Sequence, residues 1–249
     1  MKDILLKGLN ICKSFSGNKV LQSVDIELYE GDFTIIMGAS GAGKSTLLYA
    51  LSGMDKITDG EIIYKGQKLS SFSENQMAAL RAREFGFVFQ QTHLVSNLTL
   101  FENVAVAGYV GKTATPKEIR KRAMQLLKQM HVEKAKDRLP SQVSGGEAQR
   151  AAIARAMIGN PGLIFADEPT GALNKANSEE VLNLLSSLHE SGQSILMVTH
   201  DAKAAVRGNR ILYLEDGKVL DELTLPTFRE TDAREREDKV SAWLSGLQW

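Results

Sequence analysis

The stretch Gly38-Ala-Ser-Gly-Ala-Gly-Lys44-Ser45 constrains this 249-residue chain more than any other feature of its sequence. It follows the apolar, β-branched run Phe33 to Met37, which predicts a buried strand, and leads into a helical pattern from Lys44 to Ser52. Glycines at these spacings let successive backbone N–H groups point inward at phosphate oxygens, and the helix adds its positive N-terminal end. The pattern therefore predicts a strand, a phosphate-binding loop and a helix, rather than a chance glycine-rich turn.

Composition excludes several classes of protein. Hydrophobic residues at 43% and charged residues at 24% are ordinary for a soluble globular chain. The formal net charge of zero gives no indication of a nucleic-acid-binding surface. No apolar run approaches the roughly 20 residues that cross a bilayer, and the start of the chain lacks the apolar core of a signal peptide. We expect a soluble cytoplasmic protein whose single cysteine, Cys12, is a small buried residue in an early strand rather than a redox group.

Strand and helix patterns alternate over most of the chain. The first 60 or so residues consist of short apolar runs separated by turns, and Asp216-Gly217 is typical of a hairpin turn near the other end. This alternation favours a largely parallel sheet covered by helices. The expected strands and hairpin arms are Gly60 to Leu69, Phe85 to Phe89, Leu163 to Ala166, Ser194 to Val198, Arg210 to Glu215 and Lys218 to Leu223.

The region from about Gln90 to Asn160 is predominantly helical in pattern. Thr99 to Glu102 and Thr115 to Glu118 both have capping-box spacing. We therefore predict one domain over residues 1–249, with an α/β core at 1–90 and 160–225 and a helical subdomain at 91–159. Residues 226–249 form a helical tail whose apolar positions favour packing onto the same domain, a partner-binding or membrane-surface helix being the alternative.

Two acids follow the predicted strand Leu163 to Ala166. An acid at the end of a buried strand is costly unless a cation or hydrogen bonds compensate its charge. Beside a phosphate-binding loop, Asp167 is the expected Mg²⁺ partner, together with the Ser45 hydroxyl, and Lys44 is expected to reach the β- and γ-phosphates. Glu168 is placed to polarise an attacking water as a general base. The alternative is that the two acids belong to a solvated Asp-Glu-Pro turn without a catalytic role. The presence of the phosphate loop makes this alternative less favoured.

The stretch Val143-Ser-Gly-Gly-Glu-Ala-Gln-Arg150 separates this chain from other nucleoside triphosphatases. Ser144 and Glu147 have capping-box spacing at the start of a helix, which is expected to leave the Ser144 hydroxyl, the glycine amides and a positive helix end free to bind an anion. The stretch resembles the signature motif of ABC ATPases, from which Val143 and Glu147 depart. The resemblance implies that this motif binds the γ-phosphate held by a second subunit, so that ATP is sandwiched between two chains.

Four further positions extend the resemblance over nearly the whole chain. Phe15 matches the adenine-stacking aromatic, Gln90 the Q-loop glutamine and His200 the switch histidine. Considered alone, a phenylalanine such as Phe15 is more often a core residue, and a histidine at a strand end such as His200 is more often structural. Asn174 stands where the family usually has aspartate, which leaves its contact across the dimer in question. The other histidines, His93, His131 and His189, lack ligand-like spacing and are interpreted as surface or structural residues.

The resemblance implies a P-loop ABC-ATPase fold with a mixed core sheet, an antiparallel β subdomain and an inserted helical signature subdomain. It implies ATP and Mg²⁺ as cofactors. Catalytic roles fall on Lys44, Gln90, Glu168 and His200, and metal contacts on Ser45, Gln90 and Asp167. The nucleotide-binding residues are Phe15, Gly38, Ala39, Ser40, Gly41, Ala42, Gly43, Lys44, Ser45, Thr46, Gln90, Ser144, Gly145, Gly146, Glu147, Asp167 and His200.

The residue sequences of two segments resemble those of one branch of the family. Phe165 to Leu173 and Gly86 to Gln90 are similar to macrolide exporters, lipoprotein-release ATPases and, most of all, bacitracin- and antimicrobial-peptide-resistance ATPases. The implied partners are a second ABC subunit, identical or not, and a membrane permease that holds the chain at the inner face of the membrane. A regulatory ATPase that drives cell-wall remodelling without transport stays open as an alternative. A soluble ABC machine acting on nucleic acid or ribosomes is disfavoured by the neutral charge and the single cassette.

Overall fold

The computed structural model describes residues 2–112 and 114–247; the remaining positions of the predicted domain ranges, 1, 113 and 248–249, lie outside it. The strands are β1 Ile4–Phe15, β2 Asn18–Tyr29, β3 Phe33–Met37, β4 Asp59–Tyr64, β5 Gln67–Lys68, β6 Phe85–Phe89, β7 Leu163–Asp167, β8 Ser194–Val198, β9 Arg210–Glu215 and β10 Lys218–Thr224. The helices are α1 Lys44–Leu51, α2 Glu74–Glu84, α3 Leu100–Gly111, α4 Pro116–Gln129, α5 Gly145–Met157, α6 Lys175–Glu190, α7 Ala202–Ala205 and α8 Ala233–Gly246.

The chain divides into two compact units. The first unit comprises residues 1–77 and 186–249, and the second comprises residues 78–185. Helices α2 and α6 each contain residues of both units. Among the described residues, no helix is both long enough and apolar enough to cross a membrane.

The first unit holds two sheets of different character. Strands β2, β1, β4 and β5 form an antiparallel sheet in that order, whereas β9, β3 and β8 run parallel and β10 pairs antiparallel with β9. Every residue of β3 and of β8 is buried, as expected for parallel strands covered on both faces. The two long strands β1 and β2 alternate between buried and exposed residues, with several shifts of register. The predicted α/β fold with a mixed sheet and an antiparallel sheet is confirmed.

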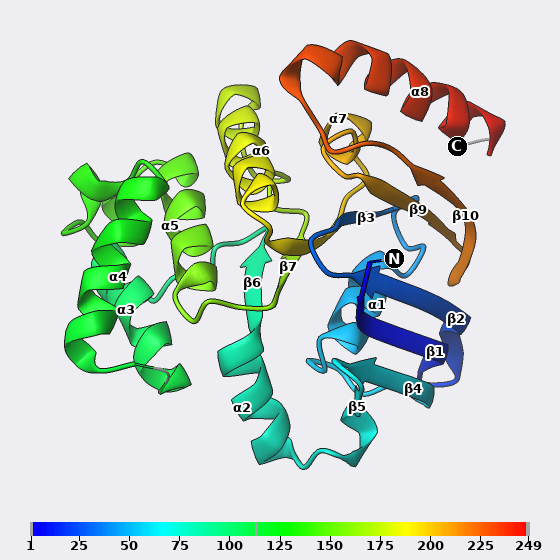
Figure 1. Ribbon diagram of the computed structural model, residues 1–249, viewed down its shortest axis with the longest axis horizontal. Helices are drawn as coiled ribbons and strands as arrows, with labels where there is room; N and C mark the ends of the chain where they lie inside the picture. The colour runs from blue at the N-terminus through cyan, green and yellow to red at the C-terminus, as the bar shows by residue number, and fades with distance from the viewer. Residues whose placement is uncertain (1, 113, 248–249) are drawn as a thin grey trace. The chain divides into compact units, whose positions relative to one another are not determined.

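The second unit combines a parallel strand pair with helices. Strands β6 and β7 pair from Phe85↔Leu163 to Phe89↔Asp167, and α5 packs on β6. Helices α3, α4 and α5 contact one another and are drawn together in green in Figure 1. The predicted capping boxes at Thr99 and Thr115 are both present, because each threonine hydroxyl accepts a hydrogen bond from the backbone of a glutamate three residues later.

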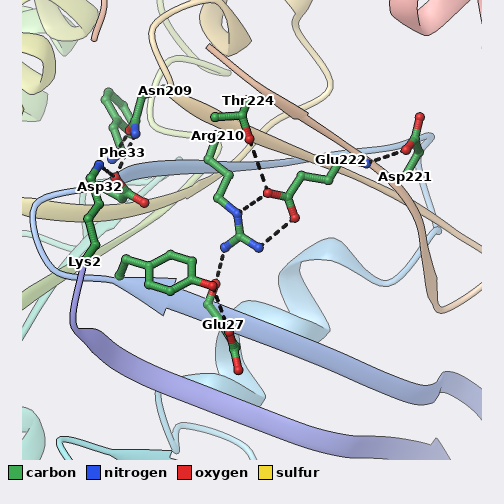
Figure 2. A network of polar contacts seen from close by, with 10 residues as sticks. Lys2, Glu27, Asp32, Phe33, Asn209, Arg210, Asp221, Glu222 and Thr224 are labelled. Carbon is green, nitrogen blue, oxygen red and sulfur yellow. Dashed lines mark hydrogen bonds and ion pairs between the residues drawn. The ribbon is translucent and has the colours of Figure 1, made fainter. Parts of the chain in front are cut away.

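Charged side chains between the strands of the first unit are paired. Arg210 on β9 makes a two-pronged ion pair with Glu222 on β10, at 2.6 and 2.7 Å, and also donates to the backbone carbonyl of Glu27 (Figure 2). Near the start of β3, the buried Asp32 accepts hydrogen bonds from Asn209 and Lys2. Because burying an unpaired charge is costly, these pairings allow the charged groups to lie among the packed strands.

The tail packs on the first unit. Val240 and Leu244 of α8 are fully buried, and the Trp243 indole N–H donates to Asp221 on β10 at 2.8 Å. Arg236, only 3% exposed, donates to three backbone carbonyls, and its guanidinium lies 5.5 Å from the centre of the Phe228 ring. The helical spacing of the apolar residues in the tail therefore corresponds to a face buried against the same unit.

Candidate active site

The phosphate loop of the first unit lies between the carboxyl end of β3 and the start of α1. Gly43 occupies the N-cap position of α1 in the left-handed region, at φ 102°, and has no side chain to cap the first helical amides. The positive end of the helix therefore lies at the loop, where it stabilises a bound anion. The buried Lys44 ammonium donates to the carbonyls of Gly38 and Ala39, both at 2.9 Å, which holds the cation over the loop.

Gly38 is required at its position by close packing of the backbone. A Cβ atom placed on Gly38 would lie 2.0 Å from the carbonyl oxygen of Leu214 on β9. No side chain can occupy that space without moving the strand, since the nearest atom belongs to the backbone. The first glycine of the loop thus permits β3 and β9 to approach while the chain turns toward α1.

His200 follows the strand that lies next to β3. Strands β3 and β8 pair in parallel with Ile36 opposite Val198, and the Thr199 N–H donates to the Ile36 carbonyl at 3.1 Å. The phosphate loop and the histidine therefore leave the sheet at the same edge, because the carboxyl ends of parallel strands coincide. His200 is exposed, and the next residue, Asp201, caps α7 by accepting from the backbone of Lys203.

Phe15, the last residue of β1, has an exposed ring with 47% of its surface accessible. Lys13 lies beneath it, with its ammonium 4.6 Å from the ring centre. That lysine is buried and is held by the Asp55 carboxylate and the Lys56 carbonyl, both at 2.6 Å. Phe15 is therefore a solvent-facing aromatic surface with a fixed cation beside it, in keeping with a base-stacking role.

In the second unit, Gln90 and Asp167 lie at the carboxyl ends of two neighbouring parallel strands. Phe89 and Asp167 are opposite one another at the ends of the parallel pair β6 and β7, and Gln90 comes directly after Phe89. Asp167 is 9% exposed, so its carboxylate belongs to the buried end of the strand. Glu168 adopts left-handed backbone, at φ 46°, immediately after this strand. A glutamate held in that sparsely populated region is typical of functional turns.

Gln90 lies against the turn that begins at Glu168. The Gly171 N–H donates to the Glu168 carbonyl at 3.0 Å, closing that turn. A Cβ atom on Gly171 would lie 2.7 Å from the Gln90 side-chain nitrogen, so the glutamine amide packs directly on the glycine. The structure thus brings Gln90, Asp167 and Glu168 together within one unit.

The N-terminus of α5 carries the complete capping box that Ser144 and Glu147 predict. The Ser144 hydroxyl accepts from the Glu147 N–H at 3.2 Å and donates to the Glu147 carboxylate at 2.8 Å. Hydrogen bonds from the Ser144 backbone and then its hydroxyl lower the pKa of Glu147, which keeps the carboxylate ionised. The serine hydroxyl is consequently engaged with Glu147, contrary to the expectation that it is free, while Ser144 and Gly145 are exposed to solvent.

Asn174 caps the start of α6. Its side-chain oxygen accepts a hydrogen bond from the Asn177 N–H at 3.0 Å, a role that asparagine and aspartate share. The same segment packs on the signature loop, since a Cβ on Gly146 would lie 2.4 Å from the Asn177 side-chain oxygen. Gly145 in turn faces Leu173, at 3.5 Å for a Cβ. The loss of charge at position 174 therefore leaves the helix cap intact.

The residues expected to bind Mg²⁺ supply suitable donors. A serine hydroxyl, a glutamine amide oxygen and a carboxylate are the hard oxygen ligands that Mg²⁺ takes from proteins. Asp167 meets a second condition, because a buried carboxylate at a strand end is stabilised by a cation. Gln90 and Asp167 in the second unit, and Ser45 in the first, therefore each supply a donor type that this metal accepts.

Some residues that position the site have no clear signal in the sequence. Lys13 and Gly171 are identified only by their contacts with Phe15 and Gln90. Gln149 and Arg150 follow the signature loop, and both are buried. These two polar residues stand directly before the alanine-rich run 151–156, and that position is a sequence signal for buried polar side chains. The sequence does not indicate their partners, Phe89 and Glu180, which lie 60 and 30 residues away.

A phosphate loop between a parallel strand and a helix, at the carboxyl edge of an α/β sheet, defines a P-loop nucleotide-binding protein. The family model described as ABC transporter matches residues 21–171, and the chain belongs to that family. Its fold is that of an ABC ATPase cassette, a class of domain that hydrolyses ATP, typically with Mg²⁺.

Similar solved structures include two of the cassette MJ0796. One is a dimeric post-hydrolysis state bound to ADP and Pi, and the other a dimer described as a bacterial ABC transporter cassette. Each is 38% identical, spans 90% of this chain and 100% of the other, and has a TM-score of 0.82. CbiO1 from Clostridium perfringens, part of the transporter complex CbiONQ, is 28% identical, with coverages of 90% and 89% and a TM-score of 0.81.

Proposed function

We propose that this chain is the ATP-hydrolysing subunit of an ABC transporter complex and that it works as half of a two-subunit motor. The observation that carries the proposal is the presence of two helices that each begin at a glycine-containing loop, α1 behind the phosphate loop and α5 behind the signature loop. A nucleotide bound to one chain uses the start of α1. The start of α5 can then bind the phosphate of a nucleotide held by another copy. The dimeric state of MJ0796 with ADP and Pi supports this arrangement.

Each residue of the site has a separate task in this proposal. Phe15 stacks on the adenine, the amides of Gly38 to Thr46 and the Lys44 ammonium bind the phosphates, and Glu168 accepts a proton from the attacking water. His200 orients that water and the γ-phosphate. The signature residues Ser144, Gly145, Gly146 and Glu147 complete the site of the partner copy.

Ser45, Gln90 and Asp167 would hold Mg²⁺, which supplies positive charge to the β- and γ-phosphates when bound. ATP favours the closed dimer because it contacts both copies, and hydrolysis removes that difference in affinity. Energy from this cycle is passed to a membrane permease, which holds the chain at the inner face of the membrane. The related CbiO1 belongs to a multi-subunit transporter complex, which supports such a partner.

Substitution of Glu168 by glutamine tests the assignment of the base. The change keeps the shape of the side chain and removes its capacity to accept a proton, so kcat should fall by about 10²- to 10⁴-fold. ATP binding should persist, and a closed ATP-bound dimer should accumulate. Steady-state phosphate release and analytical ultracentrifugation with and without ATP measure the two effects.

Glu237→Gln on the exposed side of α8 is the matched control and should behave as the unaltered chain. Hydrolysis at an unaltered rate by the Glu168→Gln variant would remove Glu168 from the role of base. Lack of ATP-dependent dimerisation in that variant would argue against the two-subunit motor.

The partner and the branch of the family are tested together. Tagged Glu168→Gln protein is purified from membranes of the native host in ATP and magnesium. Recovery of a permease with a large extracellular domain would support the branch of antimicrobial-peptide and antibiotic resistance. A regulatory role is favoured if the same permease, combined with the unaltered chain, hydrolyses ATP without moving any substrate. Recovery of ribosomes or nucleic acid without a membrane protein would contradict the transporter proposal.

A further inference from the structure

Gln149 is a buried polar side chain that connects the signature helix to the strand before Gln90. It lies on α5, is 1% exposed, and its side-chain N–H donates to the backbone carbonyl of Phe89 at 2.9 Å. An apolar residue of the same size would fill this space without the cost of burying an amide. The hydrogen bond to Phe89 therefore explains why a glutamine, and not an apolar residue, is buried at position 149.

The carbonyl of Phe89 and the N–H of Gln90 belong to one planar peptide group. A hydrogen bond to that oxygen fixes the plane, and with it the direction in which the Gln90 backbone continues beyond β6. The Gln90 side chain packs against Gly171: a Cβ atom placed on that glycine would lie 2.7 Å from the side-chain amide nitrogen of Gln90. Gln90 is thus held by Gln149 at its backbone and by the Glu168 turn at its side chain.

Helix α5 is also fixed to α6 on another side. Arg150 is 7% exposed, and its guanidinium makes an ion pair with the Glu180 carboxylate at 2.7 Å. Gly146 meets Asn177 within the first turn of α5. Gly145, Gly146, Gln149 and Arg150 therefore belong to one helix, which is tied both to α6 and to the Phe89 peptide.

We infer that Gln149 is a positioning residue that orients Gln90 toward the metal and couples anion binding at the N-terminus of α5 to that orientation. The inference rests on the proposed function, because it takes Gln90 as a metal contact. In this role Gln149 does not contact the nucleotide. Its effect on the site passes only through the Phe89–Gln90 peptide.

The test is a double-mutant cycle between Gln149→Met and Gln90→Ala in the full chain. Methionine keeps the volume of glutamine and cannot donate a hydrogen bond. Affinity for the non-hydrolysable analogue AMP-PNP is measured at increasing Mg²⁺ and in EDTA, followed by kcat and KM for ATP. A lost hydrogen bond is worth about a tenfold change in an equilibrium constant, so Gln149→Met should raise the half-saturating Mg²⁺ concentration by about that factor. Affinity in EDTA should be unchanged, and kcat should fall more than KM rises.

The double variant should be no worse than Gln90→Ala alone, because both substitutions act through the same side chain. Ile153→Val is the control, a buried change on the same helix without a hydrogen bond, and it should leave the Mg²⁺ dependence unaltered. Losses that multiply in the double variant, or a loss of affinity in EDTA, would overturn the positioning role. Failure of the unaltered chain to bind AMP-PNP would instead refute the proposed function.

Discussion

At the scale of single residues, the site depends on side chains that hold other side chains. Lys13 does not have to touch a nucleotide to affect binding, because its ammonium lies beside the Phe15 ring and is anchored by Asp55. A cation near one face of an aromatic ring withdraws electron density and limits its rotation. Stacking of an electron-rich purine on the exposed part of the ring should benefit from both effects.

Replacement of Lys13 by methionine should therefore weaken ATP binding by about two- to fivefold, the value of an exposed cation–π contact. Binding of inorganic triphosphate should not change, because the phosphate loop is untouched. Isothermal titration with both ligands measures the difference. Lys19→Met, an exposed lysine on β2, is the control. Equal loss of affinity for both ligands would assign Lys13 a general structural role.

At the scale of elements, the two helices proposed to bind phosphate, α1 and α5, begin in different ways. α1 begins at a glycine and leaves its first amides without a side-chain cap, whereas α5 begins with a full capping box at Ser144. The α1 loop also depends on the approach of β9, whose Leu214 carbonyl occupies the space where a side chain at position 38 would lie. The shape of the loop is thus decided partly by a strand that is distant in sequence.

Gly38→Ala should accordingly lower the free energy of unfolding by about 3 kcal/mol, because the new methyl group collides with backbone. Gly41→Ala in the same loop meets no atom within 4 Å, although the glycine has a φ of 84°. Its cost should be only that of left-handed backbone, about 1–2 kcal/mol. Urea unfolding of both variants gives the two values. Equal costs would show that conformational strain, and not the Leu214 contact, requires glycine at position 38.

At the scale of the whole molecule, buried polar and charged groups fasten the secondary structure of the first unit. Arg236 bonds three carbonyls under α8, and Arg210 and Glu222 join β9 to β10. His189, at the end of α6, donates its Nε2 hydrogen to the Gly31 carbonyl, 3.0 Å away, and packs edge-on against Phe33. These contacts join segments that are far apart along the chain.

Stability should fall as the pH is lowered through the titration of His189. Burial is the main cause of its lowered pKa, opposed by the Gly31 carbonyl and by Asp32. Below about pH 6.5 the unfolded chain binds a proton on this histidine that the folded chain does not bind. The free energy of unfolding therefore decreases from there until the folded pKa is reached, and then levels off.

His189→Gln keeps a donor for Gly31 and cannot titrate. Its free energy of unfolding, measured by urea denaturation from pH 7.5 to 5, should have a smaller slope than that of the unaltered chain. His131→Gln, at an exposed position, is the control and should retain the steeper slope. Identical slopes in all three proteins would exclude His189 as the source.

Local patterns predicted much of this fold because their causes are local. The strands at 85–89 and 194–198 and the capping boxes at Thr99, Thr115 and Ser144 depend on neighbours within four residues. Local patterns predict the first 60 residues less well, because the two 12-residue strands β1 and β2 contain several shifts of register. Those irregularities arise from pairing between strands, which the sequence of one strand does not express.

The sequence by itself determined the α/β class, the phosphate loop and the identity of the chemical groups, since each depends on residue type and short spacing. Only the tertiary structure decided which groups support them. Gln149 meets Phe89 across 60 residues, Lys13 meets Asp55 across 42, and Gly38 meets Leu214 of β9. The physical reason is that burial and close approach are properties of the packed chain, and many different sequences with the same local pattern could pack differently.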